Sequence, residues 1–119
     1  MSQEYQPGDY LIFQIESGYG LLRLLGIETL GEKRVWHIAA YGEMFLDIDS
    51  ADSALADAGS LTVTHPHLAL TTRAFESTQT SRMANIDLNP EELEALRQWR
   101  ESPDREISDR SVRLLLGMR

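Results

Sequence analysis

The chain has 119 residues, a formal net charge of −8 at pH 7 and a hydrophobic fraction of 42%. This length fits one ordinary domain, and this balance of hydrophobic and charged residues is typical of a folded globular protein. The absence of cysteine excludes disulfide scaffolds, thiol catalysis and cysteine-ligated zinc or iron–sulfur sites. We therefore expect a single domain over residues 1–119, stabilised by its own hydrophobic core.

Acidic residues are concentrated in the N-terminal half of the chain. Residues 1–60 contain ten acids and three bases, whereas residues 61–119 contain nine acids and eight arginines. An acidic surface repels phosphate, so we expect no nucleic-acid partner. No apolar run reaches the ~18 residues that a membrane span requires, and the first residues lack the basic and apolar regions of a signal peptide. The chain is therefore expected to be cytoplasmic and to have no membrane partner.

Alternating apolar residues between glycine-containing turns predict strands in the first part of the chain. Five segments are expected to be strands: residues 10–16, 21–28, 34–41, 44–48 and 61–64. Gly26, inside the second segment, indicates a bulge or a bend of the sheet. His65-Pro66-His67 is expected to interrupt regular pairing, because a proline nitrogen has no hydrogen to donate to a neighbouring strand.

Capping signals predict the helices. The strongest signal is the series Asn89, Pro90 and Glu92, with a capping residue, a first-turn proline and an acid that completes a capping box. It predicts a helix over residues 90–101 with an apolar stripe of Leu93, Leu96 and Trp99. Further helical segments are expected at residues 51–58 after Asp49 or Ser50, at residues 73–76 after Thr71 or Thr72, and from Ser108 or Asp109 onward, where Val112, Leu115, Leu116 and Met118 would pack. Residues 77–82 are polar and are expected to form a loop.

Short strands followed by helices predict an α+β domain. We expect a small SH3-like or Tudor-like five-stranded barrel, or a curled antiparallel sheet, over about residues 8–64. The helical part would then cover about residues 71–119. If the apolar stripe of residues 93–99 did not pack on the sheet, it would instead form the seam of a homo-oligomer.

Aromatic residues are concentrated in the segment that is expected to form the sheet. Phe13, Trp36 and Phe45 are expected to fill the core, whereas Tyr19, in a glycine-flanked turn, and Tyr41, at a strand end, are expected to be more exposed. Exposed aromatics of small barrels often line a groove that binds a protein or peptide. We predict such a groove at Tyr19, Trp36 and Tyr41, and its acidic rim would favour a basic or proline-rich protein partner.

The histidines His37, His65 and His67 are an alternative candidate site. His65 and His67 are two residues apart, so on an extended backbone both project from one face, and His37 could complete a set of metal ligands. A rigid His-Pro-His turn with ordinary surface imidazoles explains the same pattern without a metal. The chain also lacks a Gly-x-Ser-x-Gly elbow and a phosphate-binding loop. We therefore expect a non-enzymatic protein without a cofactor, with a small metal-dependent enzyme as the alternative.

Two resemblances bear on function. The series Gly8-Asp9-Tyr10-Leu11, Ser17-Gly18-Tyr19-Gly20 and Leu25-Gly26-Ile27-Glu28, with the later Tyr41-Gly42-Glu43-Met44-Phe45-Leu46, resembles the RNA-polymerase-interacting Tudor-like domain of CarD-type regulators and transcription-repair coupling factors. That resemblance implies a small barrel with a protein partner. The same opening is similar to bacterial toxin-immunity proteins, which implies neutralisation of a basic toxin. The chain is accordingly expected to be a protein-interaction module of a bacterial cytoplasmic protein.

Overall fold

The computed structural model describes residues 5–117. Its centre is a five-stranded antiparallel sheet with the strand order β4-β3-β2-β1-β5. The strands are β1 (Asp9–Ile15), β2 (Gly18–Leu30), β3 (Lys33–Tyr41), β4 (Val63–Thr71) and β5 (Ser81–Asn85). Because β4 and β5 stay at opposite edges, the sheet is open, which confirms the α+β class and the curled-sheet form of the prediction.

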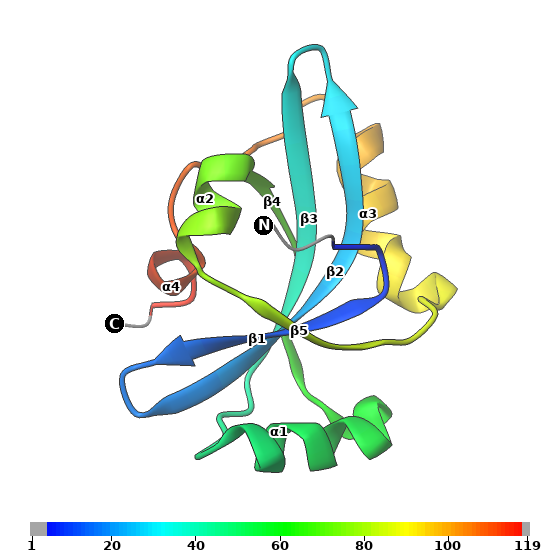
Figure 1. The fold of residues 1–119 in the computed structure, drawn as a ribbon. Helices are drawn as coiled ribbons and strands as arrows, with labels where there is room; N and C mark the ends of the chain where they lie inside the picture. Colours follow the sequence, from blue (N-terminus) through cyan, green and yellow to red (C-terminus); the bar gives the residue numbers. More distant parts are fainter. Residues whose placement is uncertain (1–4, 118–119) are drawn as a thin grey trace.

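Helices cover both faces of this sheet. They are α1 (Ile48–Ala54), the 3-10 helix η1 (Leu55–Ser60), α2 (Thr72–Ser77), α3 (Pro90–Glu101) and α4 (Val112–Leu115). Figure 1 shows α3 on one side of the upright β2–β3 hairpin and α2 with α4 on the other, while α1 lies below. We call these two sides the α3 face and the α2 face.

Alternation along β3 builds one core on each face. Trp36, Ile38 and Ala40 belong to the cluster on the α2 face, which includes Phe75 of α2 and Val112 of α4. Ala39 packs with Leu96 of α3 on the opposite face. Tyr41 belongs to the same α3 face and packs with apolar residues of α1 and η1. This two-sided burial explains why almost every residue of β3 is buried, unlike a strand with one solvated face.

The apolar stripe of α3 lies against the sheet. Leu96 is buried, and Leu93 and Trp99 pack around the same small cluster. A buried arginine, Arg23 of β2, strengthens this contact by donating to the Glu92 carboxylate of α3 at 2.8 Å. The stripe is therefore part of the core, so the condition for a homo-oligomer seam at this stripe is not met.

The β4 prediction was too short. The expected strand over residues 61–64 begins at Val63 and continues through Pro66 to Thr71. Pro66 is tolerated because β4 is an edge strand and the register shifts at this point: Leu68 lies opposite Ile38 and His65 opposite Ala40, so Pro66 faces no partner. The proline therefore marks an irregularity within the strand rather than its end.

Two other strand predictions were wrong. Residues 44–48 form no strand, and only Phe45 pairs, through one isolated bridge to Tyr19. Conversely, the polar stretch expected to be a loop ends in β5, which pairs with β1 and takes the sheet beyond residue 64 to Asn85. The sequence SRMAN of β5 has no clear alternation because this edge strand buries little of its surface.

Helices form in the expected regions of the chain, but two of them begin at other residues than expected. The capping box of Asn89 with Glu92 and the cap of α2 by Thr71 are both present. Helix α1 begins earlier than expected, after Asp47. Helix α4 begins later, after Ser111, because Ser108 is taken up in backbone bonds to β4 at Ala69 and Thr71. Met118 lies outside the described residues. No helix in the described range 5–117 is long and apolar enough to cross a membrane.

Candidate functional site

The three aromatic residues predicted to line one groove do not lie together. Trp36 is buried on the α2 face, where its ring stacks on Phe75 with 4.2 Å between centroids. Tyr41 is on the opposite face and stacks on Tyr10 at 6.1 Å. Tyr41 is only 6% exposed, so its predicted exposure was wrong. Burial, together with the neighbouring Tyr10, raises the pKa of Tyr41 well above its usual range. A groove shared by these residues therefore does not form.

Tyr19 is partly buried and holds a neighbouring segment in place. Its backbone N–H donates to Phe45 O at 2.8 Å, and Phe45 N–H donates back to Tyr19 O at 2.9 Å. The side chains of Tyr19 and Phe45 pack together against the cluster that contains Tyr41. Phe45 is thus only partly buried, although it was expected to lie in the core. This pair anchors the connection between β3 and α1 to the start of β2.

The apolar residues around Phe45 point to solvent. Met44, Leu46 and Ile48 are 54%, 86% and 52% exposed, and we call these three residues the 44–48 patch. Such a cluster within five residues is unusual on the surface of a soluble domain, whereas single exposed apolar residues are common. The alternation of residues 44–48 led to the strand prediction, and the same alternation places Phe45 inward and its neighbours outward.

Gly18 permits the close approach of this segment to β2. A Cβ added at Gly18 would lie well inside van der Waals contact of the Phe45 carbonyl oxygen. Gly18 is therefore needed for packing, since neither Gly18 nor Gly20 has a positive φ and both belong to β2. Gly20, the second glycine, instead makes room for the Phe13 ring of β1.

Acidic residues lie close to the 44–48 patch in the sequence. Residues 35–72 contain no lysine or arginine and five acids: Glu43, Asp47, Asp49, Asp52 and Asp57. Slight burial raises the pKa of Glu43, but the Thr62 N–H bound to its carboxylate has the larger combined effect and lowers it. The Ser50 N–H bound to Asp47 likewise lowers the pKa of that carboxyl. Both groups are ionised at neutral pH and lie directly beside the patch in sequence.

A second polar cluster lies on the α3 face between β2, β3, β4 and α3. His37 Nδ1 is 2.9 Å from His67 Nε2, and the two rings stack at 5.1 Å. His37 Nε2 is 3.0 Å from Glu28 Oε1, although the contact lacks the angle of a regular hydrogen bond. Arg100 Nε donates to the same oxygen at 2.7 Å, and the Trp99 ring packs on His37.

A bulge at Gly26 makes this cluster possible. The β2–β3 register shifts between Leu24 and Gly26, so that Gly26 lies opposite His37. An extra residue in one strand reverses the faces of all residues beyond it. Glu28 would otherwise point to the α2 face, whereas the bulge brings it beside His37. The sequence indicated the bulge at Gly26, but Glu28 was not identified as a partner of the histidines.

Both histidines of this cluster are neutral at pH 7. Burial lowers the pKa of His37, and the nearby Glu28 carboxylate only partly opposes this effect. Burial and the adjacent His37 lower the pKa of His67 to about 4. Glu28 stays ionised, because hydrogen bonding to Arg100 lowers its pKa against the opposing effect of burial.

The third histidine is elsewhere. His65 lies opposite Ala40, whose side chain is on the α2 face, and its ring contacts Thr64 Oγ1 at 3.1 Å. The prediction that His65 and His67 share a face was wrong because the register shift at Pro66 separates them. Within residues 5–117 no three His, Asp or Glu side chains are arranged to hold a metal ion.

The 44–48 patch and the His37–His67 cluster are thus the two candidate sites on the described part of the chain, and neither was predicted in this form. Residues 44–48 were expected to form a strand, so their exposure was not anticipated. The arrangement of the histidine pair depends on the bulges at Gly26 and near Pro66. Comparison of the chain with protein-family models, curated proteins and solved structures finds no match.

Proposed function

We propose that the protein is a non-enzymatic binding module that docks a basic protein surface onto the 44–48 patch. The observation that supports this most strongly is the exposure of Met44, Leu46 and Ile48 on a segment fixed by two backbone hydrogen bonds. Protein interfaces commonly combine an apolar centre with a polar rim, and the patch with its acidic neighbours has this composition.

The order of the segment favours binding. A loop that must become ordered on association loses conformational entropy, and that loss weakens the complex. Here the bridge between Tyr19 and Phe45 and the cap of α1 by Asp47 hold both ends of the patch before any partner arrives. Most of the apolar contact area is therefore available without further ordering of the backbone.

The acidic residues beside the 44–48 patch favour a partner with a basic surface. Ionised Glu43 and Asp47 flank the patch, and residues 35–72 contribute no compensating base. A partner with lysines or arginines around an apolar centre would be attracted at long range by these acids. On contact, its apolar centre would pack on the patch and its basic residues would face the acids. A nucleic acid would be repelled by the same groups. A basic toxin meets this description, so the immunity-protein alternative is one form of the same proposal.

The proposal is tested by affinity capture from the native lysate with the wild type and two single variants. Leu46→Ser removes the most exposed apolar residue of the patch, and Leu114→Ser removes an exposed leucine of α4 that is 68% exposed. We expect a basic protein to be retained by the wild type and Leu114→Ser and lost with Leu46→Ser. Retention of every partner by folded Leu46→Ser, or capture of acidic partners only, would contradict the proposal.

A further inference from the structure

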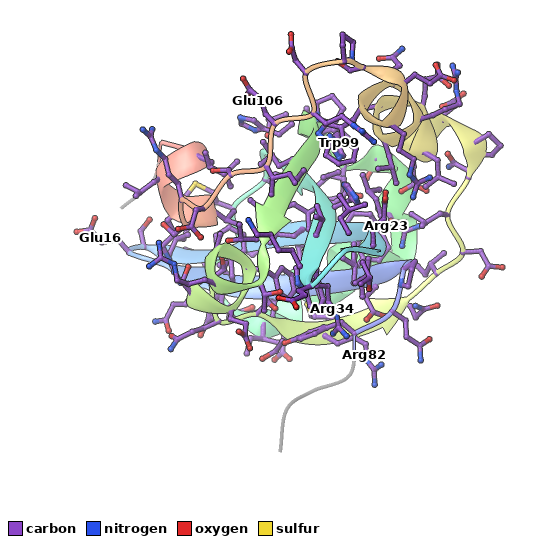
Figure 2. All side chains as sticks on the ribbon, turned by 90° about the horizontal axis from the view of Figure 1, so that it is seen from above. Glu16, Arg23, Arg34, Arg82, Trp99 and Glu106 are labelled. Atoms are coloured by element: carbon purple, nitrogen blue, oxygen red, sulfur yellow. The ribbon has the colours of Figure 1, made fainter. Side chains whose placement is uncertain are left out.

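A pocket of about 500 Å³ opens beside His67, at the outer edge of β4. Its other sides are lined by Trp99 of α3, by Leu115 at the end of α4, and by Ile107 and Ser108 of the segment that connects these helices. The Trp99 indole N–H donates to Glu106 O at 2.9 Å, which ties the connecting segment to α3. Figure 2 labels Trp99 and Glu106 close together, where this segment leaves α3. The pocket does not include the 44–48 patch.

The neighbours of His37 determine where the ring protons lie. A carboxylate oxygen presents only lone pairs, so at 3.0 Å it repels a lone pair on His37 Nε2 and favours the proton on that nitrogen, even without the angle of a regular hydrogen bond. Neutral His37 then has a lone pair on Nδ1, and His67 Nε2 must donate to it across the 2.9 Å contact. The opposite arrangement would place a lone pair of His37 against a carboxylate oxygen at 3.0 Å.

This chain of contacts leaves His67 with one free acceptor. Its Nε2 carries the proton, so its Nδ1 has a lone pair, and that atom has no hydrogen-bond partner among residues 5–117. It is also not among the described buried polar atoms that lack a partner, so it has access to solvent. His67 therefore presents an oriented acceptor beside an apolar ring, Trp99, whose centroid is 5.7 Å from its own.

We propose that this pocket binds a small, neutral, mainly apolar molecule that carries one hydroxyl or N–H donor, as phenols and indoles do, with the donor bonded to His67 Nδ1. The Trp99 ring and the side chains of Ile107 and Leu115 supply the apolar contacts. Glu106 and Arg110 contribute one charge of each sign to the lining, so the pocket as a whole favours neither anions nor cations. An acceptor-only analogue would leave the His67 lone pair desolvated and unpaired.

The test compares two nearly isosteric probes, 4-methylphenol and 4-methylanisole, by NMR titration of labelled protein. The phenol has the donor, whereas in the anisole a methyl group replaces that hydrogen. We expect 4-methylphenol to shift the Trp99 indole and His67 imidazole signals and to bind at least about tenfold more tightly than 4-methylanisole, because a site that is built to receive a hydrogen bond rejects the analogue that lacks it.

Two histidine variants, and a measurement of which His67 nitrogen carries the proton, complete the test. His67→Phe keeps a ring at this position without the acceptor and should abolish the preference for the phenol, whereas His65→Phe should retain it. Independently of any variant, nitrogen shifts should show His67 protonated at Nε2. Equal affinities for the two probes, shifts centred on Trp36 instead of Trp99, absence of binding, or a proton on His67 Nδ1 would each overturn the proposal.

Discussion

Arg23 lies under helix α3 with its guanidinium bonded to the Glu92 carboxylate at 2.8 Å, and its side chain is only 2% exposed. The same guanidinium donates to the carbonyl oxygens of Gly8 and Asp87 and lies 4.1 Å from the centroid of the Tyr10 ring. One buried cation thus joins β1, β2, the segment before α3 and α3 itself. The Arg23 guanidinium is thus held by a carboxylate, two backbone carbonyl oxygens and an aromatic face.

Removal of Glu92 should destabilise the fold strongly. Glu92→Ala leaves the Arg23 guanidinium buried without its counter-ion and removes half of the capping box, so we expect a loss of about 3 kcal/mol in the free energy of unfolding. Urea denaturation followed by circular dichroism measures this loss. Glu91→Ala, on the exposed side of the same helical turn, is the matched control and should cost less than about 0.5 kcal/mol.

The double variant Arg23→Met with Glu92→Met separates charge from packing. Replacing both members of a buried pair by apolar residues avoids the unpaired cation, so the double variant should be more stable than Glu92→Ala. A double variant that is less stable than Glu92→Ala would contradict this prediction and would show that the attraction between the two charges outweighs the cost of burying them.

Protonation of His67 should cost stability. In the folded chain, burial and the adjacent His37 lower the pKa of this histidine from its ordinary value of 6.5 to about 4. Between these values the unfolded chain binds a proton that the folded chain does not, so the free energy of unfolding decreases as the pH is lowered from 6.5 toward 4. His37, whose pKa is also lowered, contributes in the same direction, whereas the facing Glu28 carboxylate moderates both effects.

Denaturant titrations at several pH values across this window test the prediction. The wild type should lose stability steadily from pH 6.5 downward, and His67→Gln should show a shallower dependence. His65→Gln, which leaves the cluster intact, should behave like the wild type. An identical pH dependence in His67→Gln and the wild type would mean that His67 titrates alike in the folded and unfolded chains.

Gly18→Ala should displace the segment that carries the 44–48 patch. The new Cβ collides with the backbone at Phe45, which cannot move without loss of its bridge to Tyr19, so we expect a loss of about 1–3 kcal/mol in stability and weaker partner capture. Gly59→Ala is the control, because a Cβ there has no neighbour within 4 Å. If Gly18→Ala kept its fold and captured the partner as well as the wild type does, binding would not depend on the position of this segment, and the prediction would be contradicted.

Local chemistry made the caps and turns predictable from the sequence. The capping box at Asn89 and the bulge at Gly26 both depend on residues close in the chain, and both are present. The edge strand β5 was missed because it buries little and therefore shows no hydrophobic pattern. The strand was expected to end before Pro66 because a proline cannot donate a backbone hydrogen bond. Whether that missing donor ends a strand depends on whether the strand lies at an edge of the sheet, and β4 does.

The site residues were harder to predict for the same reason. Tyr41 occupies a strand end in the sequence, yet α1 and η1 fold back and bury it. The pair His37 and His67 was among the candidates, but its contact with Glu28 depends on the face reversal at Gly26. The likeness of the N-terminal segment to the Tudor-like RNA-polymerase-interacting domain stays a prediction.

The 44–48 patch is the surface that we propose meets a basic protein partner. Site-specific photo-crosslinking in the cells that produce the protein tests it most directly, with a photoreactive phenylalanine placed at position 46 or, as control, at position 114. We expect one adduct with a basic protein from position 46 and none from position 114. Adducts from position 114 alone, or equally from both positions, would contradict it.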